Sequence, residues 1–261
     1  MRIGGAGVSR DQGHVAFCRC LYQRWHPFRR FPGFSTGSSM TNFATARQKM
    51  VDGQVLTSDV TDHRILDAML TLPREMFVPA EKQALAYLDL DLDVGGTGTV
   101  RRYLLKPMLT AKLLQAAGIQ STDTVLIVGC ATGYIAALAA RLAGKVTATE
   151  SDTALAAQAR DVLSKLGFQE NVSIEVAEAA AGWPASPAYD TIILNGATEI
   201  APKALFEQLA EGGRLVGVWA ANRPSRAMIV THSRGDFGNR VLFDAAAPVL
   251  PGLERRPEFV F

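Results

Sequence analysis

The stretch Val125-Leu126-Ile127-Val128-Gly129-Cys130-Ala131-Thr132-Gly133-Tyr134 decides the fold of this 261-residue chain. Four apolar residues in a row are typical of a strand that is buried on both faces of a parallel sheet. The small residues that follow predict a tight turn, in which the backbone lies open to a ligand. From Tyr134 onward the sequence is rich in alanine and leucine and predicts a helix. A strand, a small-residue turn and a helix in this order are typical of a ligand-binding corner in α/β proteins.

The spacing of the turn favours one class of ligand. The dinucleotide pattern G-x-G-x-x-G places its last glycine one residue later than the G-x-A-x-G found at residues 129–133. The tighter turn suits the methionine part and the ribose of S-adenosylmethionine better than a pyrophosphate. Glu150 ends the next predicted strand, where a carboxylate can accept hydrogen bonds from both ribose hydroxyls. Taken alone, the turn could serve only for tight packing, and Glu150 could be a surface acid at the end of a strand. Together, in this order, they favour a nucleoside-type cofactor.

Helix and strand patterns alternate around this turn, which predicts an α/β fold with a mostly parallel, doubly wound sheet. Two β-like segments near the end of the chain, with Gly235 and Gly238 between them, predict a closing antiparallel hairpin. The predicted strands are 124–128, 145–149, 172–176, 191–194 and 214–219, the predicted helices are 104–117, 134–142, 153–166 and 203–209, and the hairpin pairs 226–232 with 240–243.

Two further segments precede this core, which we place at 104–261. Residues 40–103 predict an N-terminal helical cap, with a helix at 41–51 and another that ends before Pro73, followed by a substrate loop. Residues 1–39 carry six arginines against one acid and show no apolar periodicity. They are interpreted as a disordered extension or as sequence upstream of a true start at Met40, with a transit peptide as the alternative.

The composition excludes several classes of protein. A net charge of +2 gives no electrostatic footprint for nucleic acid or for a membrane surface. The longest uncharged stretch, Thr124–Ala140, is too short to span a bilayer and is broken by glycines. Three cysteines form no disulfide framework, which favours a reduced, cytoplasmic location. Four histidines lie in unrelated segments, so no metal site is expected. For the oligomeric state, a monomer is favoured.

Longer motifs outside the turn carry a resemblance to a known family. They include Leu72-Pro73-Arg74-Glu75-x-Phe77-Val78-Pro79, Ala181-Gly182-Trp183-Pro184 and Gln208-Leu209-x-x-Gly212-Gly213-Arg214-Leu215-Val216. In combination they resemble the protein-L-isoaspartate O-methyltransferases, from Met40 to about Leu253. The resemblance implies a Rossmann-like fold and methyl transfer from S-adenosylmethionine to the α-carboxylate of isoaspartyl residues. The expected partners are therefore proteins or peptides that contain damaged aspartate or asparagine sites.

The resemblance also implies which residues hold the cofactor. The turn at 129–133 would bind the methionine part, Glu150 the ribose, and the segment 177–179 the adenine. Asn195, at the end of a strand, lies where ligands of α/β proteins bind. The expected cofactor-binding residues are Gly129, Cys130, Ala131, Gly133, Tyr134, Glu150, Ser151, Glu178, Ala179 and Asn195. Cys130 is interpreted as a small filler, with a reactive thiol as the alternative.

The chain departs from the family pattern at the cofactor site. The family has an acid in the first strand where this chain has Ile127, and a glycine in the middle of the turn where it has Ala131. The family's G-D-G beside adenine is replaced by Ala177-Glu178-Ala179.

The substrate loop departs further. The family reads G-x-G-Q-T-I-S-x-P, whereas residues 95–102 read GGTGTVRR, which places the family serine at Arg101 and its proline at Tyr103. A carboxylate is already ionised at pH 7, so the enzyme mainly has to position it. Thr99, through its hydroxyl, and Arg101, through a bidentate guanidinium, are the candidate catalytic residues. Arg101 and Arg102 are alternatively two solvated loop cations.

These departures leave other functions open. One alternative is a methyltransferase for another carboxylate, and another is a non-catalytic protein that senses the cofactor or damaged proteins. A nicotinamide-dependent oxidoreductase is disfavoured by the spacing of the turn.

Overall fold

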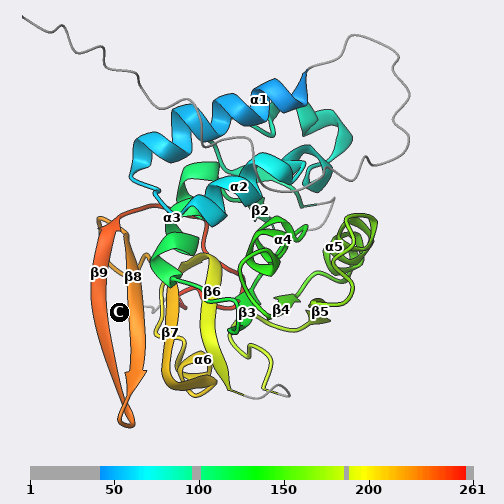
Figure 1. Ribbon diagram of the computed structural model, residues 1–261. Helices are drawn as coiled ribbons and strands as arrows, with labels where there is room; N and C mark the ends of the chain where they lie inside the picture. The colour runs from blue at the N-terminus through cyan, green and yellow to red at the C-terminus, as the bar shows by residue number, and fades with distance from the viewer. Residues whose placement is uncertain (1–41, 96–100, 185–187, 257–261) are drawn as a thin grey trace, which may run out of the picture. The chain divides into compact units, whose positions relative to one another are not determined.

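The computed structural model describes residues 42–95, 101–184 and 188–256, which lie in the compact unit Met40–Phe261. Within these residues, one sheet has the strand order β5-β4-β3-β6-β7-β8-β9 (Figure 1). Neighbouring strands from β5 to β7 are parallel, whereas β8 and β9 are antiparallel. The strands are β3 Thr124–Val128, β4 Lys145–Glu150, β5 Val172–Val176, β6 Tyr189–Thr198, β7 Leu209–Trp219, β8 Arg226–Ser233 and β9 Asp236–Asp244. The Rossmann-like fold expected from the sequence is confirmed.

Side chains of the central strand β3 alternate between two hydrophobic cores. Val125 and Ile127 belong to the larger core, which also contains residues of the helices α3, α4 and α5. Leu126 and Val128 belong to the smaller core on the other face of the sheet, together with Leu205 of α6. Because both faces of β3 are covered, its sequence is an uninterrupted apolar run rather than an alternating one.

Helices cover this sheet and build a cap beside it. Asn42 caps the first helix, since its side chain accepts a hydrogen bond from the Thr45 N–H at 3.1 Å. Pro107 occupies the first position of α3, where its missing N–H costs nothing. The helices are α1 Phe43–Met50, α2 His63–Thr71, α3 Pro107–Ala117, α4 Tyr134–Ala140, α5 Thr153–Lys165 and α6 Lys203–Phe206, with a π turn at Val51–Val55 and 3-10 turns at Leu56–Ser58, Arg74–Phe77 and Ala80–Leu85.

The predicted elements are present, and the differences lie at their ends. The helix predicted at 104–117 begins at Pro107, and the one predicted at 203–209 ends at Phe206 because β7 begins at Leu209. A two-stranded ladder, β1 Leu92–Asp93 with β2 Tyr103–Leu104, was not predicted. Two residues are too few to show a strand period.

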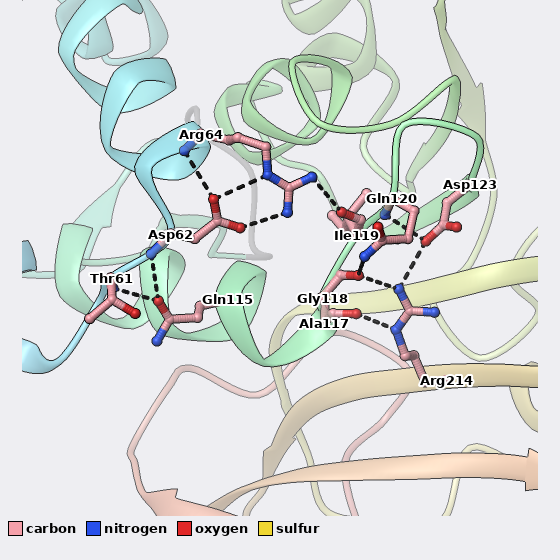
Figure 2. A network of polar contacts seen from close by, with 10 residues as sticks. All are labelled: Thr61, Asp62, Arg64, Gln115, Ala117, Gly118, Ile119, Gln120, Asp123 and Arg214. Carbon is pink, nitrogen blue, oxygen red and sulfur yellow. Dashed lines mark hydrogen bonds and ion pairs between the residues drawn. The ribbon is translucent and has the colours of Figure 1, made fainter.

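A polar network joins the cap to the sheet at the C-terminal end of α3 (Figure 2). Arg214 of β7 donates to the carbonyls of Ala117 and Gly118, the latter at 2.8 Å, and pairs with Asp123 at 2.9 Å. From the other side, Arg64 of α2 donates to the carbonyl of Ile119 at 3.0 Å. Cations at the end of a helix satisfy carbonyls that have no partner within the helix and oppose its dipole. The arginine of the Gly212-Gly213-Arg214-Leu215-Val216 motif is therefore a structural residue.

We expect Arg214→Ala to lower the free energy of unfolding by about 2–3 kcal/mol, because several half-buried acceptors lose a charged donor together. The matched control is Arg226→Ala on the neighbouring strand β8, whose ion pair with Asp244 at 3.4 Å is exposed. Its loss should cost less than about 1 kcal/mol. Urea unfolding of both variants measures the difference, and equal losses would show that the network contributes nothing particular to stability.

Candidate cofactor site

The turn between β3 and α4 has an unusual backbone. Gly129, Ala131 and Gly133 have φ angles of +71°, +51° and +93°, all in the left-handed region. Glycine adopts this region freely, whereas an alanine there costs about 1–2 kcal/mol. The position that holds a glycine in the related family is therefore strained in this chain.

Glu150 compensates for this strain. Its Oε2 atom accepts a hydrogen bond from the Ala131 N–H at 2.7 Å, and its Oε1 atom accepts from the N–H groups of Ser151 at 3.0 Å and Asp152 at 3.2 Å. The side chain is completely buried at the end of β4. Hydrogen bonds to a carboxylate are stronger than those between neutral groups. Glu150 thus holds the turn, and the structure brings together two of the features that the sequence analysis singled out.

Arg102 also binds this carboxylate. Its Nε lies 3.0 Å from Oε1 of Glu150, and its Nη2 lies 2.8 Å from Oε2. The arginine side chain is 4% exposed, so the two charges form a bidentate ion pair away from water. The interpretation of Arg102 as a solvated loop cation is therefore wrong. A buried charge without its partner is costly, so either residue requires the other.

The guanidinium of Arg102 fills the space in front of the turn. A Cβ atom placed on Gly129 would lie 2.6 Å from Nη2 of Arg102 and 2.7 Å from Cδ2 of Leu250. Both side chains therefore pack directly on the glycine backbone. Only glycine leaves room for them, which is a second reason for a glycine at this position.

Leu250 reaches this place from the C-terminal segment of the chain. Ala197 of β6 donates to the carbonyl of Pro248 at 2.8 Å, and its carbonyl accepts from the Leu250 N–H at 2.9 Å. Glu199 donates to the carbonyl of Leu253 at 2.9 Å. The segment 248–253 therefore runs along the carboxyl end of β6, where ligands of α/β proteins bind. Part of this strand end is therefore paired with the chain's own C-terminal segment.

Asn195 completes the frame around the turn. It is 5% exposed, and its Nδ2 atom donates to the carbonyl of Gly129 at 2.9 Å. The strands β3 and β6 are neighbours in the sheet, so their carboxyl ends meet here. The structure thus brings Asn195, Glu150 and the turn 129–133 together, as the sequence analysis expected of a cofactor site.

Cys130 and Tyr134 face protein rather than an open site. Burial, assisted by the charge of Glu150, raises the pKa of the Cys130 thiol far above its usual range, so the thiol is protonated and serves as a filler. The Tyr134 ring is fully buried between Phe77, at 5.2 Å, and the guanidinium of Arg74, at 4.8 Å from the ring centroid. Its side chain packs α4 against the cap.

The residues expected beside adenine lie in the loop after β5. Glu178 is exposed and Ala179 is buried in the smaller core. Gly252 of the C-terminal segment passes close to Glu178, since a Cβ atom on that glycine would lie 3.8 Å from Oε2. The segment 248–253 therefore extends from the glycine turn to the loop after β5 that contains Glu178.

Of the two candidate catalytic residues, Thr99 lies outside the described residues. Arg101 is well exposed, with 75% of its side-chain surface accessible, and pairs loosely with Asp93 at 3.8 Å. Neighbouring residues of one loop thus have opposite environments, because Arg101 faces solvent and Arg102 faces Glu150.

Sequence reasoning missed the contacts that Arg102 and Leu250 make at the turn. Arg102 lies 48 positions from Glu150 in the chain. No spacing rule connects residues so far apart, and the adjacent Arg101 has the same side chain.

With this geometry in view, comparison with known proteins is decisive. Residues 45–237 match the family model of protein-L-isoaspartate(D-aspartate) O-methyltransferase. The chain belongs to this family. A protein-L-isoaspartate O-methyltransferase 1 of Syntrophobacter fumaroxidans is 34% identical over 74% of this chain and 88% of its own length. That of Koribacter versatilis is 40% identical over 68% of this chain and 78% of its own length.

Solved structures support the fold. One called protein-L-isoaspartate O-methyltransferase aligns with a TM-score of 0.71 at 24% identity, over 80% of this chain and 67% of that one. Another, from Plasmodium falciparum, has a TM-score of 0.67 at 16% identity, over 81% of this chain and 99% of that one. The expected membership in a family of protein carboxyl methyltransferases is thereby confirmed.

No helix among residues 42–95, 101–184 and 188–256 is both long and apolar enough to cross a membrane. In the same part of the chain, no three His, Cys, Asp or Glu side chains gather as metal ligands would.

The environment of Cys130 predicts its reactivity. In a Cys18→Ser/Cys20→Ser background, we expect the native protein to resist a disulfide reagent at pH 8, because the thiol is buried and its raised pKa keeps the thiolate population negligible. Unfolding in guanidinium should release one reactive thiol. Labelling of the native protein on mixing would contradict the filler role of Cys130.

Proposed function

We propose that this chain binds S-adenosylmethionine at the carboxyl ends of β3, β4 and β6 and transfers its methyl group to the carboxylate of isoaspartyl residues. The observation that carries the proposal is the meeting of the turn 129–133, Glu150 and Asn195 in a member of this family. The Plasmodium falciparum relative with the same fold was crystallised with S-adenosyl-L-homocysteine. The proposed partners are isoaspartyl-containing proteins or peptides.

The backbone of the site fits such a cofactor, and one side chain has to move. A left-handed turn of small residues and a buried carboxylate at the end of β4 are what a ribose and an amino-acid tail require. Arg102 and Leu250 occupy the space in front of Gly129. The Arg102 guanidinium has to leave Glu150 before ribose hydroxyls can take its place. In the proposal, the turn and Glu150 hold the methionine part and ribose, and Glu178 and Ala179 flank the adenine.

S-adenosylmethionine supplies an electrophilic methyl group on a sulfonium, which a carboxylate oxygen can displace without any proton transfer. The protein therefore needs no general base, because the carboxylate is ionised at neutral pH. Its contribution is to align the nucleophile and exclude water. The buried walls formed by Asn195, Leu250 and the turn exclude water on the cofactor side.

On the substrate side, Arg101 offers an exposed guanidinium next to the cofactor site. Its only ion pair within the described residues is the loose contact with Asp93. A carboxylate of a substrate can replace that contact with a bidentate one. In this proposal Arg101 captures the carboxylate, and Thr99 supplies a hydroxyl to orient it.

A second candidate function is a protein that senses the cofactor or damaged proteins without turnover. Residues 101–109 contain neither serine nor threonine, so no aliphatic hydroxyl from this stretch replaces the family serine. If the family's S-x-P precedes α3 with its proline at Pro107, the serine position falls on Leu105, which is buried. In either register, an aliphatic hydroxyl from the segment 95–109 can come only from Thr97 or Thr99.

The proposal extends to the organisation of the chain. Residues 40–103 form the substrate side, residues 104–261 form the cofactor-binding core, and residues 1–39 are dispensable for activity. A monomer in the cytoplasm is the proposed state, in line with the cysteine content and the weak net charge.

The test is methyl transfer by the protein started at Met40. It is incubated with methyl-labelled S-adenosylmethionine and an isoaspartyl peptide, with the same peptide carrying ordinary aspartate as control. Transfer to the isoaspartyl peptide alone is the expected result. Binding of the cofactor without transfer to either peptide would instead favour the sensing function.

Arg101→Ala should raise the KM for the isoaspartyl peptide about tenfold, which corresponds to the loss of one charged hydrogen-bonding partner. The fold should be unaffected because the side chain is exposed. Lys82→Ala is a matched control, since Lys82 binds the carbonyl of Asp93, at 2.6 Å, on the same short strand. An unchanged KM in Arg101→Ala would remove the substrate role.

A further inference from the structure

Arg102 occupies the position that a ligand of the glycine turn needs. It binds Glu150 in a bidentate manner and lies against the backbone of Gly129, the two features expected to hold the ribose and the methionine part. No other cation contacts Glu150 among the described residues. This single side chain therefore contacts both the carboxylate expected to bind the ribose and the turn expected to bind the methionine part.

We propose that Arg102 sets the cofactor affinity and selectivity of this chain by occupying the space in front of the glycine turn, so that a cofactor binds only when its ribose displaces the guanidinium from Glu150. The inference rests on the proposed function, because it assumes that the cofactor binds at the turn and at Glu150. In this proposal Arg102 competes with the ribose hydroxyls for Glu150 and does not itself bind the cofactor.

The competition follows from the number of acceptor sites on a carboxylate. Two carboxylate oxygens offer about four lone-pair directions. In Glu150 these directions are already shared by five donors, which are the N–H groups of Ala131, Ser151 and Asp152 and the Nε and Nη2 atoms of Arg102. Ribose hydroxyls can be accepted only if Arg102 leaves, since the backbone donors are fixed by the turn and by the end of β4.

The release of Arg102 requires only a rotation of its side chain. The Arg102 carbonyl accepts hydrogen bonds from the N–H groups of Val94, at 2.8 Å, and Gly95, at 3.2 Å. These bonds hold the backbone beside β1 while the guanidinium moves. Arg101 shows that the same loop carries a guanidinium in solvent. The opposite wall is fixed, because Leu250 is anchored to Ala197 through a backbone hydrogen bond at 2.9 Å.

Charge adds a selectivity to the competition. S-adenosylmethionine carries a sulfonium and is a net cation, whereas S-adenosylhomocysteine has a neutral thioether. A guanidinium that stays near the turn 129–133 repels the positively charged sulfonium but not the neutral thioether. Wild-type protein should therefore favour the product over the cofactor, and removal of Arg102 should shift this preference toward the cofactor.

The experiment is a calorimetric titration of the full chain with S-adenosylhomocysteine and with S-adenosylmethionine. Arg102→Ala and Arg102→Met are compared with wild type, and Lys82→Ala is the control because it removes one positive charge that binds the short strand β1 and not Glu150. We expect both Arg102 variants to bind S-adenosylhomocysteine at least tenfold more tightly and to gain more for S-adenosylmethionine. Lys82→Ala should bind within twofold of wild type.

Thermal unfolding of each variant, with and without S-adenosylhomocysteine, verifies that it is folded and gives an independent measure of affinity. Arg102→Met keeps most of the apolar stem, so it serves if Arg102→Ala does not fold. Unchanged or weaker binding by a folded Arg102 variant, with binding retained in wild type, would overturn the inference and leave the proposed function intact. No binding of either compound by any folded variant would overturn both.

Discussion

The ion pair between Arg102 and Glu150 is the contact on which the organisation of the site depends. Glu150 is buried at the end of a central strand, and an ionised carboxylate there requires donors on every side. The turn provides one donor, the start of the following loop provides two, and Arg102 provides the charge. The strained turn, the Arg102 side chain and the end of β4 are thus held in one arrangement by a single carboxylate.

The motifs that identify the family mostly serve this scaffold. Arg74 of the Pro73-Arg74-Glu75 motif is fully buried and donates to the carbonyls of Ala86, at 2.6 Å, and Leu105, at 2.7 Å, which fixes the cap to the segment leading into α3. Arg214 fixes the other end of that helix (Figure 2). The cap and α3 are therefore positioned by arginines that bind backbone carbonyls.

The site combines a frame that suits a nucleoside cofactor with two side chains that fill the space in front of it. The left-handed turn, the strand-end carboxylate and the asparagine beside Gly129 are compatible with a nucleoside cofactor. Arg102 and Leu250 fill the same space from within. In the proposed exchange, a ligand at this site replaces the hydrogen bonds of Arg102 to Glu150 with hydrogen bonds of its own. In such a site the affinity reflects the difference between two nearly equal sets of hydrogen bonds.

The sequence by itself determined the order of helices and strands, the parallel sheet and the importance of Gly129, Gly133 and Glu150. These follow from local signals, since apolar periodicity, glycine in a turn and an acid after a strand are all visible within a few residues. Only the tertiary structure decided which of two adjacent arginines is buried and that Leu250 covers the turn. Those contacts join segments far apart in the chain, and the energy of a buried charge depends on the groups that surround it in space rather than on its neighbours in sequence.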